Sequence, residues 1–250
     1  MIDYTIANEY TLPSEGKVYS QNVTPQFKLR SMTTVEEMKR LNHSDKPYKT
    51  LAEILDDCLV EDIGISAYDL CLADYQYMLH KLRIVTYGPN YKVDSVCPYC
   101  GSTNHLTTNL DELTVKPLNK ELFDKAIEFV LPVSKKSIRL RMQTPRMLDN
   151  NLVKTKEEKR LNSSNMDPSF LIGIESMIET IDGEKPEEFR LRPFVQKLPM
   201  MDTNYILQSA EKLTNCLGLE STIEHTCSIC GLAYKSNFRT TSEFFRPSID

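Results

Sequence analysis

The sequence contains four cysteines in two matching pairs, and these are its strongest candidates for a functional site. The motif CPYCG spans residues 97–101 and the motif CSICG spans residues 227–231. In each motif two residues separate the cysteines, so a tight turn can aim both thiolates at one metal ion, about 2.3 Å from each sulfur. The following glycine permits φ > 0, which returns the chain to a strand while its amide faces a sulfur. The sequence therefore predicts a tetrahedral Zn²⁺ site with these ligands: Cys97, Cys100, Cys227 and Cys230.

This zinc is expected to be structural, because four protein ligands leave no coordination position for water or substrate. Residues 101–226 separate the two pairs, a gap far longer than in an ordinary zinc ribbon. The ends of this insert must therefore return to one place. Three alternatives stay open at this stage. His105 or His225 could replace one cysteine, or the cysteines could be two redox pairs or simply buried, although neither pair lies at a clear strand-to-helix junction.

Composition narrows the class of protein. The 250-residue chain has no apolar run near the roughly 18 residues that a membrane span needs, and its N-terminus lacks the pattern of a secretory signal. We therefore expect a reducing compartment, in which clustered cysteines indicate metal rather than disulfides. The 35 acidic and 30 basic residues give a net charge of −5, which argues against a nucleic-acid partner. The other cysteines, Cys58, Cys71 and Cys216, occupy apolar helical positions and are expected in the core.

Local signals predict the elements that must position the cysteine pairs. Thr33 or Thr34 is expected to cap a helix, with a glutamate three residues later, and Thr144-Pro145 begins another that runs to about Leu161. Ser66 and Asp202 are expected to cap two further helices. Strands are predicted at 4–12, 26–29, 91–96 and 105–110, and a hairpin is predicted from 122–131 and 137–142.

These elements predict an α+β fold with three parts. Residues 1–84 form an N-terminal α+β region that is largely helical. Residues 85–110 together with 220–250 form a small zinc-ribbon-like β subdomain, closed by two CxxCG knuckles. Residues 111–219 form a long, mainly helical insert. No GxSxG, GxGxxG, GxxxxGK[ST] or HExxH motif is present, so the sequence predicts no enzymatic activity.

Several short motifs occur in order along the chain: Leu12-Pro13-Ser14-x-Gly16-x-x-Tyr19; Leu82-Arg83 and Tyr87-Gly88 before Cys97-Pro98-x-Cys100-Gly101; and Cys227-x-x-Cys230-Gly231 before Phe244-Phe245-Arg246-Pro247. In this order they resemble the baseplate hub subunit and hub-assembly proteins of large contractile-tailed, T-even-like bacteriophages. The insert has no motif that matches. The four cysteines and the terminal aromatic segment match well enough to receive roles.

The resemblance implies a non-enzymatic structural or assembly role in the baseplate hub, in the virion tail baseplate or in the host cytoplasm during assembly. Partners would be other hub or tail proteins, and zinc would brace a docking surface. The hydropathy and the net charge given above argue against a membrane or a nucleic-acid partner. One ring of Phe244-Phe245 is expected to pack on the zinc subdomain and the other to reach a different surface. The alternatives are a nucleic-acid-binding zinc-ribbon accessory factor and an enzyme braced by zinc.

Overall fold

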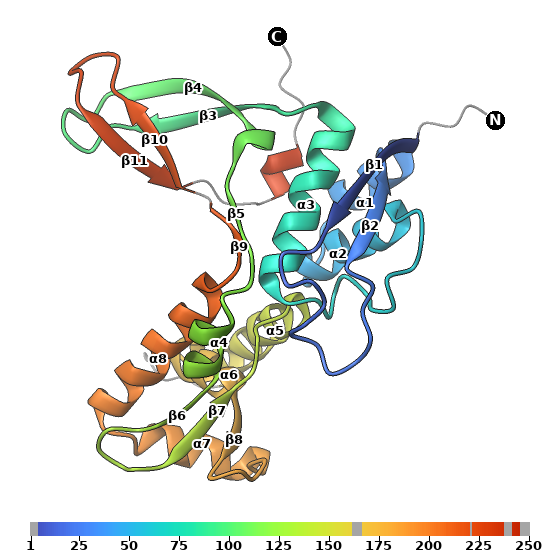
Figure 1. Ribbon diagram of the computed structural model, residues 1–250. Coiled ribbons are helices and arrows are strands. Elements are labelled where there is room, and N and C mark those ends of the chain that lie inside the picture. Colours follow the sequence, from blue (N-terminus) through green and yellow to red (C-terminus); the bar gives the residue numbers. More distant parts are fainter. Residues whose placement is uncertain (1–4, 162–166, 221, 238–241, 246–250) are drawn as a thin grey trace.

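The computed structural model describes residues 5–161, 167–220, 222–237 and 242–245. Helices and several small antiparallel sheets alternate along the chain, which confirms the α+β class. Two hairpins project to one side of the molecule, and the helices of the insert extend in another direction (Figure 1). No helix in the described ranges has the length and apolarity needed to cross a membrane. The domain boundaries given above stay a prediction.

Two paired strands and three helices form the N-terminal region. They are β1 (Thr5–Thr11), β2 (Gln26–Arg30), α1 (Thr34–Leu41), α2 (Pro47–Cys58) and α3 (Leu72–Tyr87). Thr33 caps α1 in a capping box with Glu36, as predicted. The prediction for Ser66 is wrong, because α3 begins only at Leu72. Ser66 instead forms a turn in which its hydroxyl accepts a hydrogen bond from the Tyr68 amide at 3.2 Å.

A buried carboxylate anchors the loop that follows β1. Asp74 on α3 is fully buried. It accepts hydrogen bonds from the amide and hydroxyl of Ser14 and from the Tyr19 hydroxyl, the last at 2.6 Å. Burial raises the pKa of Asp74 above its usual value. The first motif of the resemblance therefore joins this loop to the longest helix of the N-terminal region.

Two hairpins and a short two-stranded neck lie beyond the N-terminal region. The hairpins are β3 (Asn90–Val96) with β4 (Thr103–Asn109), and β10 (Thr222–Thr226) with β11 (Ala233–Asn237). A short 3₁₀ turn, η1 (Leu110–Glu112), follows β4. The neck pairs β5 (Val115–Lys116) with β9 (Gly218–Leu219). At Gly218 φ is 105°, and a Cβ would lie 2.9 Å from that of Ala73, so only glycine fits this close approach to α3.

The insert combines helices with a three-stranded antiparallel sheet of order β6-β7-β8. Its elements are α4 (Lys120–Ile127), β6 (Glu128–Val130), β7 (Ser137–Leu140), α5 (Pro145–Leu161), α6 (Ser169–Met177), β8 (Ile178–Ile181), α7 (Glu188–Gln196) and α8 (Met200–Asn215). The start and end predicted for α5 are confirmed. The strand predicted at 122–131 is wrong up to residue 127, because Asn119 caps a helix there through the Leu122 amide.

Two buried aspartates of the insert hold loops and helix ends in place. Asp202 does not cap α8, which begins at Met200. Its carboxylate accepts hydrogen bonds from the amides of Val133 and Ser134 at 2.8 and 2.9 Å. Asp149 on α5 accepts from the Tyr48 and Lys49 amides at 3.3 and 2.8 Å. It thereby caps α2, whose own N-cap residue supplies no side-chain hydrogen bond.

The terminal aromatic pair belongs to the N-terminal core, which corrects the expectation that one ring reaches a different surface. Phe244 and Phe245 lie in a short 3₁₀ turn, η2 (Ser242–Phe245), and both are fully buried. Phe244 stacks on His80 and packs against Tyr91, with ring centroids 5.7 and 5.1 Å apart. Buried Arg83 donates from Nε to the Phe244 carbonyl at 3.0 Å. Arg246 and Pro247 lie outside the described residues.

Phe244→Ala should lower the free energy of unfolding by about 3–5 kcal/mol, because it removes a fully buried ring from a packed core. The matched control is Phe189→Ala, since 70% of Phe189 is exposed on α7. Chemical denaturation of both variants measures the effect. A loss no larger for Phe244→Ala than for the control would contradict a core role for the tail.

Candidate metal centre

Each cysteine pair lies in the loop of its hairpin, and the two loops have the same backbone structure. The Cys97 amide donates to the Ser102 carbonyl at 2.9 Å, and the Cys227 amide donates to the Leu232 carbonyl at 3.0 Å. Gly101 and Gly231 have φ of 72° and 73°, as the left-handed turn requires. Their amides donate to the carbonyls of Cys97 and Cys227. The expectation that these amides face a sulfur is therefore wrong.

The four sulfur atoms form a cluster with the dimensions of a tetrahedral metal site. All four Sγ atoms lie within 4.8 Å of one another. The Cys97–Cys230 and Cys100–Cys227 separations are 3.8 and 3.7 Å. Four sulfurs placed tetrahedrally at about 2.3 Å from zinc would be about 3.8 Å apart, whereas a disulfide needs about 2.05 Å. The geometry therefore fits a metal ion held by four thiolates.

Local hydrogen bonds favour thiolate at part of the cluster. The pKa of Cys227 is lowered to about 5, chiefly because the Cys230 amide faces its sulfur, with help from the Ser102 hydroxyl. The hydroxyl and amide of Ser102 lower the pKa of Cys100. At Cys230 the Leu232 amide also lowers the pKa, but desolvation of the sulfur within the cluster and the neighbouring thiols outweigh it and raise the value to about 12. Sulfurs this crowded cannot all ionise without a cation, and a divalent metal supplies one.

A buried asparagine that sequence reasoning missed connects the two knuckles. Asn104 on β4 accepts hydrogen bonds from the amide and hydroxyl of Ser228, both at 2.9 Å. Its Nδ2 lies 3.6 Å from the Cys227 sulfur. The only available signal was strand alternation, which turns a polar residue at this position inward. Asn104 therefore positions the second knuckle against the first hairpin, without contributing a ligand.

The histidines and the other cysteines lie outside the cluster. His105 pairs with Asp94 at 2.6 Å, and His225 pairs with Ser236 at 2.7 Å. Neither histidine joins the candidate metal-binding group, which contains cysteine alone. Cys58, Cys71 and Cys216 are buried elsewhere, as expected for core residues. Both knuckles occupy hairpin loops, so neither has the strand-to-helix setting of a thioredoxin-like redox pair.

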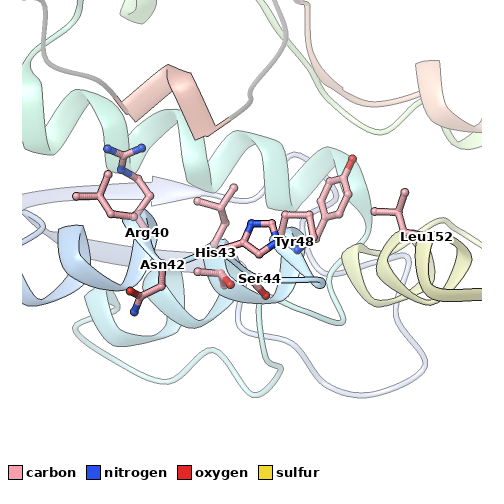
Figure 2. A pocket seen from close by; sticks show the side chains of 10 residues that line it. Arg40, Asn42, His43, Ser44, Tyr48 and Leu152 are labelled. Carbon is pink, nitrogen blue, oxygen red and sulfur yellow. The ribbon is translucent and has the colours of Figure 1, made fainter. Parts of the chain in front are cut away.

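A pocket of about 520 Å³ lies away from the cysteines, between α1, α2 and α5. Figure 2 shows Arg40 and Leu152 at its two ends, with His43, Ser44 and Tyr48 between them. The Ser44 hydroxyl accepts from the Lys46 amide at 3.1 Å. Within the described residues His43 does not hydrogen-bond this hydroxyl, so the pair lacks the contact that activates a nucleophile. We assign no reaction to this pocket.

Comparison with known proteins gives one match. A family model described as T4 bacteriophage base plate protein matches residues 4–246, a range that includes both knuckles and the buried aromatic pair. No curated protein and no solved structure matches the chain significantly.

Cys97→Ser or Cys230→Ser should abolish stoichiometric zinc binding and strongly lower the melting temperature, because each removes one of four ligands and metal binding contributes to folding. Metal content by elemental mass spectrometry and thermal unfolding measure both effects. Cys216→Ser is the matched control, since this buried thiol lies outside the cluster. Zinc content and stability that stay normal in Cys97→Ser would contradict the site.

Asn104→Ala should weaken zinc affinity by about 10- to 100-fold, the usual effect of losing a residue that orients a ligand. The control is Thr107→Ala at an exposed position of the same strand. Competition with a chelator of known affinity measures the difference. Equal affinities in the two variants would show that Asn104 does not position the site.

Proposed function

The chain belongs to the T4 bacteriophage base plate protein family, and we propose that it is a structural or assembly protein of the baseplate hub, braced by one zinc ion. Family membership makes it a baseplate protein of the phage tail, with other tail proteins as its partners. The hub assignment and the zinc are more specific than family membership. The ordered sequence motifs support the hub assignment, and the observation that carries the zinc is a four-cysteine cluster of tetrahedral dimensions.

Cys97, Cys100, Cys227 and Cys230 would hold the zinc, which supplies no reaction and acts as a cross-link when bound. The hairpins that carry these cysteines join the helical body at the neck. Few buried side chains pack beneath the knuckle loops themselves. The hydrophobic cluster at the knuckles contains only Cys97, Cys227 and Tyr234 among the described buried residues. A core this small cannot fix the two loops alone. The metal would fix them before binding, so less conformational entropy is lost when a partner docks.

A nucleic-acid-binding accessory factor is the second candidate, because many zinc ribbons bind nucleic acid. The charge of the chain argues against this nucleic-acid-binding function. The net charge is −5, and neither loop, 97–102 or 227–232, contains lysine or arginine. Phosphate binding depends on such cations. We therefore favour protein partners, which the chain would meet in the host cytoplasm during assembly and in the virion tail if it is incorporated.

Complementation of a phage that lacks this protein tests the proposal. Wild-type chain and Cys216→Ser should restore complete baseplates, whereas Cys230→Ser should leave baseplates without a hub, seen by electron microscopy. Full restoration by Cys230→Ser would contradict the role of the metal. Baseplates that keep an intact hub without the protein would contradict the hub assignment. Mass spectrometry of finished particles distinguishes an incorporated subunit from an assembly factor.

A further inference from the structure

Four apolar side chains are exposed around the cysteine cluster. They are Val96 (64% exposed), Tyr99 (63%), Ile229 (74%) and Leu232 (50%). We call them the knuckle-tip patch. Each lies one or two residues from a cysteine whose sulfur belongs to the cluster, so all four lie at one end of the paired hairpins. Exposed apolar groups gathered in one place mark interaction sites on many soluble proteins.

No other described part of the chain covers this end. In Figure 1 the loops of β3–β4 and β10–β11 point away from both the N-terminal helices and the insert. The buried side chains beneath the patch, Cys97, Cys227 and Tyr234, form their own small cluster. Tyr99 and Ile229 occupy the same position in the two CxxC motifs. The repeated knuckle therefore presents an aromatic or a branched apolar side chain from each loop.

The charges near the knuckle-tip patch indicate the chemistry of the partner surface that it would bind. Residues 95–104 and 226–234 contain no aspartate, glutamate, lysine, arginine or histidine. The nearest ion pairs lie farther along the strands, at Asp94–His105 and Glu224–Lys235. Four thiolates around one divalent ion keep a net negative charge. Two of the sulfurs, those of Cys100 and Cys230, belong to exposed residues.

We propose that the knuckle-tip patch docks onto an apolar surface of another baseplate protein that presents lysine or arginine to Cys100 and Cys230. This inference rests on the proposed zinc site. The apolar side chains supply buried area, and a cation opposite the exposed sulfurs forms charge-assisted N–H···S contacts. The same arrangement disfavours nucleic acid and anionic lipid, because both place negative charge against the centre.

Photocrosslinking in complemented phage tests the proposal. A benzoylphenylalanine residue replaces Tyr99 in one chain and Phe189, an equally exposed aromatic residue on α7, in the control. Infected cells are irradiated while baseplates assemble, and the adducts are digested and sequenced by mass spectrometry. Position 99 should give at least about tenfold more adduct than position 189, with a baseplate-protein peptide that contains apolar residues and lysine or arginine. Tyr99→Ser combined with Ile229→Ser should lower the yield of complete baseplates by about tenfold or more while zinc content stays normal.

Equal yields at positions 99 and 189 would overturn the proposal. So would an adduct from position 99 with nucleic acid, lipid, a second copy of this chain or a baseplate segment that lacks basic residues. Zinc is measured in the same samples. Wild-type chain without zinc contradicts the proposed function itself, whereas zinc-loaded chain that gives no baseplate adduct at position 99 overturns this docking surface alone.

Discussion

The structure depends on joining two hairpins whose cysteines meet although they stand 127 positions apart in the sequence. The entropy of closing so long a loop grows only slowly with length, but the chain must still return to one point. The neck provides this return: Val115 and Lys116 pair with Leu219 and Gly218, and the Glu220 amide donates to the Thr114 carbonyl at 2.8 Å. The neck thus places the two hairpins side by side, and a bound ion would cross-link their loops.

The N-terminal region also contacts residues that follow the second hairpin in the sequence. Phe244 and Phe245 are buried beside α3. Arg83 is buried there, donates to the carbonyls of Phe244 and Gly88, and lies over the Tyr87 ring at 4.8 Å. The motif residues Arg83, Tyr87-Gly88 and Phe244-Phe245 therefore contribute packing contacts and hydrogen bonds within this core. The hairpin pair is attached to the body at the neck and at this aromatic turn.

Sequence reasoning predicted the parts of the fold that depend on local signals. The capping box at Thr33, the Thr144-Pro145 helix start and the strand before Cys97 are all confirmed, because each depends on neighbouring residues. At residues 122–127 it overlooked a local signal, because Asn119 caps a helix there through the Leu122 amide. At Asp202 a distant contact determines the outcome: its carboxylate anchors the loop at Val133 instead of capping its own helix.

In the candidate site, too, local signals could be predicted from the sequence and distant contacts could not. Spacing and glycine position were sufficient to group the four cysteines. The role of Asn104 was hidden, because its partner Ser228 lies 124 positions away. The buried state of the terminal aromatic pair was also hidden, since its pocket is built by α3 and Tyr91. Contacts between residues so far apart in the sequence can be recognised only when the fold is known.

X-ray absorption at the zinc edge, measured on protein purified from its natural source, shows whether the four cysteines hold a zinc ion. We expect one zinc ion per chain with four sulfur neighbours at about 2.3 Å. Protein without metal, or a metal bound by nitrogen or oxygen in place of one or more sulfurs, would contradict it.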